Sequence, residues 1–379
     1  MPDINQLPTP ALLLDLDILE QNLQRMQAKA LKARVQLRPH IKTHKCVELA
    51  KKQIFLGAKG ITVSTFYEAE QFAKMGFGDI TWAFPLPPVY ASHVARMAEH
   101  HTIRVLVDSA EARTYLEKAA RTAGTNVHVW LKVDCGSHRA GIDPTKPDAI
   151  DLARSLAESD ALTFDGILTH AGHSYGASSP AAIRAVAEQE RIVMVGFAQT
   201  LRNAGIAVPG VSIGSTPTMT LGESLDGITE IRPGNYCFYD YTQAMLGVCT
   251  VGDCALTVLA SVVSRQPGAA HFITDAGALA LSKDMGATHL RNDMGMGILF
   301  EDYERKRLFA YVDMQIQSLS QEHGNVQIEP GHEPAPFCVG DRIRILEHHS
   351  CLTAAMFDKY YVVRGNDVME EWKILRGRM

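Results

Sequence analysis

The stretch VHVWLKV, residues 127–133, is followed by a polar loop, a helical pattern from Pro147 to Glu158 and a second apolar run from Leu162 to Thr169. Short apolar runs rich in β-branched residues predict buried strands, whereas the segment between them has the spacing of an amphipathic helix. Strands that are joined through a helix run parallel in one sheet. This unit therefore predicts an α/β domain built on a parallel sheet.

The same alternation extends in both directions from this unit. Further strands of the same kind are expected at residues 35–37, 60–64, 79–84, 103–107, 208–213 and 229–231. Eight strands in a domain of this length predict a (β/α)₈ barrel of the TIM type. A doubly wound open sheet is the alternative, but no glycine-rich dinucleotide turn follows the first strand.

The pattern changes near residue 250. Beyond it, the apolar runs are short, often alternating, and separated by Gly, Pro and Asp, with few helical periods between them. Such runs predict a mostly antiparallel β domain. We therefore expect a barrel over residues 1–250 and a β domain over residues 251–379, with residues 1–15 packing against the second domain.

Composition narrows the kind of protein. The chain has 379 residues, 46% of them hydrophobic and 21% charged, and a net charge of −5, which is typical of a soluble globular protein and argues against nucleic acid or an anionic membrane as the main partner. No apolar stretch approaches the roughly 20 residues that span a bilayer. The N-terminus lacks the pattern of a secretory signal, and the seven cysteines are scattered. We therefore expect a cytoplasmic protein with reduced thiols.

The run RPHIKTHK, residues 38–45, directly follows the first strand. A lysine at the carboxyl end of a barrel strand, here Lys42, is well placed to form a Schiff base. Its ammonium form is a poor nucleophile, so the side chain must be partly desolvated or held near other cations. We expect Arg38, His40, His44 and Lys45 to provide this basic surrounding. A basic surface turn without catalytic function is the alternative at this point.

Two glycine-containing loops follow the last strands of the predicted barrel. GSTPT covers residues 214–218 and RPGNY covers residues 232–236. Each alone is compatible with an ordinary turn, but a glycine with hydroxyl neighbours after a late strand can also present N–H groups to a phosphate. A lysine and a phosphate site on the same face of a barrel together meet the requirements of pyridoxal phosphate (PLP).

Five motifs carry a resemblance to a known family: RPHIKTHK, VDCGSHRAG at 133–141, GSTPT, RPGNY and HHSCLTAAMFD at 348–358. The chain resembles the fold-type III PLP enzymes of the D-threonine aldolase and D-serine dehydratase group, which are related to alanine racemase in their barrel. Within this group it is most similar to the metal-dependent D-serine and D-threo-3-hydroxyaspartate dehydratases. The resemblance extends over nearly the whole chain.

The resemblance implies a role for each motif. Lys42 would carry PLP, Arg139 would contact the ring hydroxyl, and His170 would lie close to the ring. The candidates for the phosphate site are Gly214, Ser215, Thr216, Gly234 and Asn235. Tyr175 is a candidate for the pyridine nitrogen or for a second catalytic group, and since His173 lies near it in the sequence, the assignment between the two stays open.

His349 and Cys351 are separated by one residue. On an extended segment, side chains at i and i+2 point to the same side, where imidazole and thiolate form half of a tetrahedral metal site. Alone, this pattern is more often a buried cysteine beside a surface histidine. The resemblance implies a divalent metal here, and thiolate favours zinc over manganese, cobalt or magnesium.

These expectations combine into a dehydratase that removes water from a D-β-hydroxy amino acid, such as D-serine or D-threo-3-hydroxyaspartate, and gives a 2-oxo acid and ammonia. Lys42 would take the Cα proton, and the metal would bind the β-hydroxyl. The alternative is retro-aldol cleavage to glycine and an aldehyde, although aldolases of the group typically carry His-x-Asp at the metal pair. The resemblance also implies a homodimer in which residues 275–284 are offered to the partner subunit.

Overall fold

A computed structural model of the chain describes residues 3–293, 295–304, 307–308, 314–328 and 337–377. The chain divides into two compact units. The barrel unit comprises Arg25–Lys42, Val47–Gly234 and Gly377–Met379. The β unit comprises Met1–Gln24, Thr43–Cys46 and Asn235–Arg376. The predicted domain boundary at residue 250 stays a prediction, and each unit is described below by itself.

The barrel unit contains eight parallel strands in the order β2-β9-β8-β7-β6-β5-β4-β3. An isolated parallel bridge between His40 and Thr62 connects the two ends of this order. The predicted TIM-like (β/α)₈ barrel is therefore confirmed. The strands are β2 (Gln36–Leu37), β3 (Ile61–Val63), β4 (Asp79–Pro85), β5 (Thr102–Val107), β6 (Val127–Lys132), β7 (Leu162–Leu168), β8 (Gly210–Ile213) and β9 (Glu230–Ile231).

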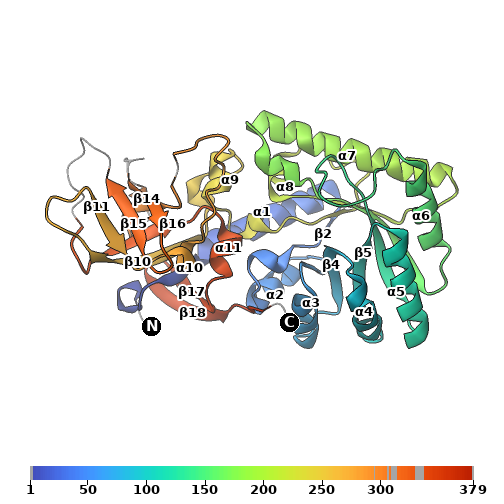
Figure 1. Cartoon of the computed structure of the whole chain (residues 1–379), viewed down its shortest axis with the longest axis horizontal. Helices are drawn as coiled ribbons and strands as arrows, with labels where there is room; N and C mark the ends of the chain where they lie inside the picture. The colour runs from blue at the N-terminus through green and yellow to red at the C-terminus, as the bar shows by residue number, and fades with distance from the viewer. Residues whose placement is uncertain (1–2, 294, 305–306, 309–313, 329–336, 378–379) are drawn as a thin grey trace. The chain divides into compact units, whose positions relative to one another are not determined.

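Helices follow most of these strands and lie around the outside of the sheet (Figure 1). Local sequence fixes their ends: Thr65 and Glu68 form a capping box at the start of α3, and Gly124, with φ of 64°, ends α5 in the left-handed region. The helices of this part of the chain are α1 (Leu16–Ala33), α2 (Val47–Phe55), α3 (Phe66–Lys74), α4 (Ala91–Ala98), α5 (Ala110–Ala123), α6 (Pro147–Ala157), α7 (Pro180–Asn203) and α8 (Thr216–Leu221), with 3₁₀ turns η2 (Ile41–Thr43), η3 (Pro88–Tyr90) and η4 (Gly172–Gly176).

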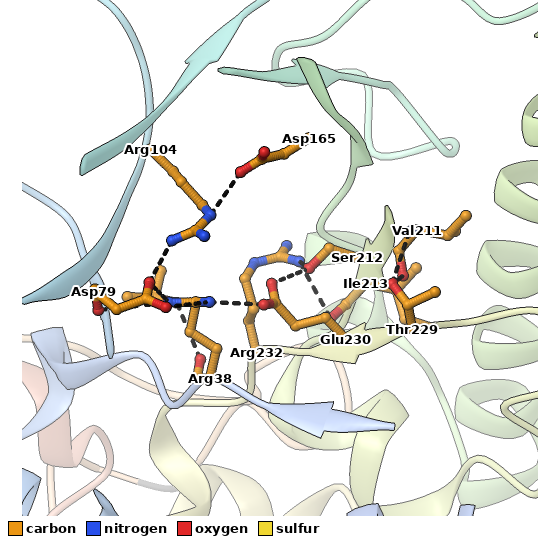
Figure 2. A network of polar contacts seen from close by, with 11 residues as sticks. Arg38, Asp79, Arg104, Asp165, Val211, Ser212, Ile213, Thr229, Glu230 and Arg232 are labelled. Carbon is orange, nitrogen blue, oxygen red and sulfur yellow. Dashed lines mark hydrogen bonds and ion pairs between the residues drawn. The ribbon is translucent and has the colours of Figure 1, made fainter. Parts of the chain in front are cut away.

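A network of ion pairs connects several strands of the barrel unit (Figure 2). Arg38, only 2% exposed, donates from Nε to Glu230 at 2.7 Å and also forms an ion pair with Asp79. Asp79 pairs in turn with Arg104, whose Nε is 2.6 Å from Asp165. Because carboxylates surround its guanidinium, Arg38 does not add a free positive charge near Lys42. The prediction that Arg38 belongs to the basic surrounding of the lysine is therefore wrong.

A second branch of this network starts at Glu230. Ser212 donates to Glu230 at 2.6 Å, and the Arg232 guanidinium donates to Ser212 and to the carbonyl of Thr169. The pKa of Arg232 is lowered to about 10, because the effect of burial exceeds the opposing effect of the nearby carboxylates. This branch ties the ends of β7, β8 and β9 together below the loops that carry the candidate site.

The β unit contains a ten-stranded sheet in which β1 pairs with β10 antiparallel and with β17 parallel. The remaining pairings are antiparallel, which confirms the predicted β character of this region. One apolar cluster is formed by Leu13, Leu259 and Val363 with their neighbours. The strands are β1 (Ala11–Asp15), β10 (Leu256–Ser264), β11 (His271–Thr274), β12 (Ile298–Asp302), β13 (Arg307–Leu308), β14 (Met314–Leu319), β15 (Gly324–Ile328), β16 (Arg342–Leu346), β17 (Lys359–Arg364) and β18 (Asp367–Lys373).

Short helical segments connect these strands. They are η1 (Ile4–Gln6), η5 (Asn235–Cys237), η6 (Val251–Asp253), α9 (Tyr241–Met245), α10 (Ala278–Leu281) and α11 (Ser350–Ala354). Two of them, η5 and α11, carry residues of the candidate site.

Candidate active site

Lys42 lies in η2, directly after β2, as the sequence predicts. The backbone leading to it is held by the loop after β9, because the His40 N–H donates to the carbonyl of Pro233 at 3.0 Å. The side chain of Lys42 is exposed. Its amine is therefore accessible to a ligand at the carboxyl end of the strand.

Cationic side chains of the barrel unit act together on His170, which follows β7. Burial is the largest cause that lowers the pKa of His170 well below its ordinary value, and the charges of Lys42, Arg139 and Lys132 lower it further. The Nδ1 atom is 2.8 Å from the carbonyl oxygen of Gly214. Because a carbonyl only accepts, Nδ1 carries the proton, so Nε2 is an acceptor in a neutral ring. The surroundings of His170 are thus positively charged, and the imidazole itself is not.

Lys132 is one of the cationic side chains that act on His170, and the sequence analysis did not predict its role. It ends β6, is 7% exposed, and its Nζ donates to the carbonyl of Val133 at 3.2 Å. Burial and the charge of Arg232 lower its pKa to about 8. The signal was present in the stretch VHVWLKV, because a lysine at the last position of a buried strand points to the catalytic end of a barrel.

Two backbone N–H groups of the predicted phosphate loop at 214–218 form hydrogen bonds within the chain. The Gly214 N–H donates to Glu190 Oε1 at 3.1 Å, and the Ser215 N–H donates to Thr218 Oγ1 at 3.0 Å. Gly214 has φ of +126°, and a Cβ there would lie 3.0 Å from Met219 Cγ, so this position requires glycine. Both N–H groups thus have partners within the chain, and the contacts of Gly214 and Ser215 with a phosphate stay predictions. The contacts of Thr216 and Gly234 with phosphate stay predictions.

Glu190, on α7, is a second residue whose role the sequence analysis did not predict. Its buried carboxylate accepts from the N–H groups of Ala171 and Gly214, both at 3.1 Å, and from Thr218 Oγ1 at 3.2 Å. It thereby joins the loops that follow β7 and β8. Burial raises the pKa of this carboxyl, while these hydrogen bonds lower it. The sequence does contain a signal, because Glu190 occupies a position at helical spacing from the buried residues of α7, Ile183, Ala187, Met194, Phe197 and Leu201.

His173 and Tyr175 lie in the same short turn, η4. Both ring nitrogens of His173 are buried, and neither has a hydrogen-bond partner among the described residues. Burial lowers the pKa of this imidazole. Buried polar atoms without partners are uncommon in folded proteins, so the ring is suited to contact a ligand. The roles of His173 and Tyr175 stay predictions.

In the β unit, His349 and Cys351 lie together, but not on the extended segment that the sequence predicted. His349 has extended backbone angles and is the N-cap of α11, whose first turn contains Cys351. The Nδ1 atom of His349 is 2.7 Å from Asp284 Oδ2. The side chain of Cys351 lies close enough to His349 to raise its pKa. Since Nδ1 is engaged by Asp284, Nε2 is the ring nitrogen that a metal shared with the sulfur would use.

Protonation of this pair depends on its neighbours. Burial lowers the pKa of His349, but the hydrogen bonds with Asp284 and Cys351 outweigh burial and raise it to about 11. The bond with His349 also lowers the pKa of Asp284. A metal at Nε2 takes the place of a proton there.

Other side chains of the β unit support the two donors. Thr43, the residue that follows Lys42 in the chain, has Oγ1 at 3.2 Å from Cys351 Sγ. Asp284 lies in the segment that was predicted to be offered to a partner subunit, and it contacts His349 of its own chain instead of pointing away from it. A contribution of residues 275–284 to a partner stays a prediction.

The described part of the chain contains no cluster of three or more His, Cys, Asp or Glu side chains that could hold a metal ion. Binding of a metal by His349 and Cys351 therefore stays a prediction. None of the described helices is both long and apolar enough to cross a membrane.

Comparisons with known proteins identify the family of the chain. Residues 14–242 match the model of the alanine racemase N-terminal domain, and residues 255–363 match that of a putative serine dehydratase domain. D-threo-3-hydroxyaspartate dehydratase from Delftia sp. HT23 is 37% identical over 98% of both chains, and its structure matches with a TM-score of 0.94 over all of both chains. Another structure of that enzyme is a cysteine-to-alanine variant described as the metal-free form.

Two further relatives have similar coverage. D-serine dehydratase from Dictyostelium discoideum is 35% identical over 98% of this chain and 97% of its own. D-threonine aldolase from Arthrobacter sp. is 30% identical over 97% of this chain and 92% of its own. The chain belongs to the family of alanine racemase-like enzymes that contains these D-serine and D-threo-3-hydroxyaspartate dehydratases.

Proposed function

We propose that this protein is a lyase that uses PLP and a divalent metal to dehydrate D-β-hydroxy amino acids such as D-serine or D-threo-3-hydroxyaspartate. The observation that carries the proposal is that the side chains of His349 and Cys351 lie close enough to interact, in a chain that is similar to a dehydratase over 98% of its length. A thiolate in this pair distinguishes the site from the His–carboxylate pair expected of an aldolase.

The barrel unit fits an anionic aromatic cofactor. Lys42, Lys132 and Arg139 make the surroundings of His170 positive, which suits the phosphate and the ring hydroxyl of PLP. The unpartnered ring nitrogens of His173 supply further polar contacts. When bound, PLP supplies an electron sink for negative charge that develops at the substrate Cα.

In this proposal, each residue of the chain has a separate task. The Lys42 amine would hold the cofactor between turnovers and would take the Cα proton when substrate replaces it. Neutral His170 would lie against the cofactor ring without adding charge, and Arg139 would hold the ring hydroxyl. Loss of water from the substrate would leave an enamine, which hydrolyses in water to a 2-oxo acid and ammonia. His173 and Tyr175 are the candidates for contacts with the reacting substrate.

The donor set fits zinc best. A metal here would be held by His349 Nε2 and Cys351 Sγ and would supply a Lewis acid for the departing β-hydroxyl. Thiolate favours zinc over manganese, cobalt or magnesium, and the two-residue set leaves room for the hydroxyl oxygen. Asp284 fixes the tautomer of His349 that presents Nε2.

The family resemblance further supports a homodimer with a small-molecule D-amino acid as its substrate, and the scattered cysteines support a cytoplasmic location. We expect no nucleic acid or membrane partner, in line with the net charge of −5.

A product assay tests the proposed function. We expect D-serine and D-threo-3-hydroxyaspartate to yield ammonia and the corresponding 2-oxo acid, with an absorbance band of the lysine-bound cofactor before substrate is added. Release of glycine and an aldehyde would favour the aldolase, and a protein without bound cofactor would contradict the assignment altogether.

Replacement of Arg139 tests the cofactor site separately. Arg139 is exposed, so we expect Arg139→Ala to keep the melting temperature while raising the dissociation constant of PLP by about tenfold, the cost of one charge-assisted hydrogen bond. Arg139→Lys is the matched control: it keeps the charge but not the planar fork, and should lie between the two. A large drop in melting temperature would instead make Arg139 a structural residue.

A further inference from the structure

Asp240 is a buried carboxylate to which neither the sequence motifs nor the proposed chemistry gives a role. It is the N-cap of α9 and is 1% exposed. Its Oδ1 accepts from the Gln243 N–H at 2.9 Å, which caps the helix. Its Oδ2 accepts from Asn235 Nδ2 at 2.7 Å and from the Ser350 N–H at 3.1 Å. Oδ1 therefore caps the helix, whereas Oδ2 accepts hydrogen bonds from two different segments.

The two segments that meet at Oδ2 are both parts of the candidate site. Asn235 belongs to the RPGNY motif, which is predicted to bind the cofactor phosphate. Ser350 lies between the two metal donors and begins α11. Asn235 Nδ2 is also 2.9 Å from Ser350 Oγ, so Asn235, Asp240 and Ser350 form a closed triangle of hydrogen bonds.

We propose that Asp240 is a positioning residue that fixes both the cofactor loop at Asn235 and the metal-binding turn at Ser350. One carboxylate oxygen holds the Asn235 side chain and the backbone at the start of the turn, so its loss loosens both binding sites at once. This inference rests on the proposed function, because it assumes that the chain binds PLP and a metal.

Asp284 offers a matched comparison within the same unit. Its carboxylate holds the ring of His349 at 2.7 Å and the N–H of Gly286 at 2.8 Å, and no hydrogen bond described for it reaches the RPGNY motif. Amide-for-carboxylate replacement at Asp284 should therefore affect the metal and leave the cofactor unchanged. The same replacement at Asp240 should affect both.

The experiment compares the wild type with Asp240→Asn and Asp284→Asn. The zinc dissociation constant is measured by competition with a chromogenic chelator, and the PLP dissociation constant by titration of cofactor-free protein. For Asp240→Asn we expect zinc binding to weaken by roughly 10- to 100-fold, as for other outer-shell residues, and PLP binding by about tenfold. For Asp284→Asn we expect only the zinc constant to change.

A second variant keeps the test decisive if Asp240→Asn alone is unstable. Asp240→Ser keeps one side-chain oxygen that can cap α9, but it has no second oxygen for Asn235 and the Ser350 N–H. Its melting temperature should therefore stay near the wild-type value, while the zinc and PLP dissociation constants should both rise. Wild-type values of both constants in this variant would contradict the inference.

The remaining outcomes are also distinguishable. A wild type that binds neither zinc nor PLP refutes the proposed function. A wild type that binds both, together with an Asp240→Asn variant that binds both equally well, leaves the proposed function intact and refutes the role of Asp240. An Asp240→Asn variant that loses zinc affinity alone would contradict the inference, because Asp240 would then support only the metal donors, as Asp284 does.

Discussion

Lys42→Ala should abolish turnover and remove the visible absorbance of bound cofactor. The tether and the base are the same amine, and since Lys132 is buried and bonded to the Val133 carbonyl, no described amine is placed to replace both functions. Steady-state assays of ammonia release and an absorbance spectrum of the purified variant measure the two effects. We expect activity at or below the detection limit, which is the largest effect of any single substitution considered.

Lys51→Ala is the control for this experiment. Lys51 is an exposed lysine on α2, a short distance along the chain from Lys42. Its replacement should leave both the spectrum and the rate unchanged. A Lys42→Ala variant that keeps a sizeable fraction of wild-type turnover would show that the PLP assignment is wrong.

Removal of the metal should have the second largest effect. Chelation is expected to abolish dehydration while PLP stays bound, and Cys351→Ala should reproduce this result because one imidazole alone holds zinc poorly. Added zinc should restore the chelated wild type but not the variant. Loss of zinc affinity should exceed the roughly 10- to 100-fold effect of an outer-shell residue. Ammonia release and cofactor absorbance, measured before and after chelation, separate the two cofactors.

Two further substitutions sharpen this test. Cys338→Ala removes an exposed cysteine of the same unit and should change neither metal content nor rate. Cys351→Asp should shift metal preference towards manganese and impair elimination more than any retro-aldol side reaction, because departure of hydroxide needs the stronger Lewis acid. Full-rate dehydration by the chelated wild type would refute the metal's role.

The barrel was predictable because its signal is local. Each strand is a short apolar run, and each helix has its own amphipathic period, so the eightfold alternation can be read without knowledge of long-range contacts. The same holds for Lys42, whose place after β2 follows from its position in the sequence alone.

The supporting carboxylates were not predictable in the same way. Asp240 and Asp284 reach the segment of His349 across 110 and 65 residues, and no local pattern indicates those contacts. The conformation of His349–Cys351 also depends on such a contact, because the Ser350 N–H donates to Asp240 where the chain enters a helical turn. Arg38 was misassigned for a related reason: its carboxylate partners lie 41 and 192 residues away.

The ion-pair network of Arg38, Asp79, Arg104 and Glu230 also limits how this barrel can diverge. Removal of Arg38 would take away the ion-pair partner of the buried Glu230, and breaking a buried pair in this way typically costs about 3–5 kcal/mol, whereas joint replacement by apolar residues of similar volume is often neutral or stabilising. Substitution of Arg38 alone should therefore be selected against more strongly than replacement of the charged residues together. Homologous barrels should either retain these charges together or have exchanged them as a block, so the identity of one of these residues predicts the others.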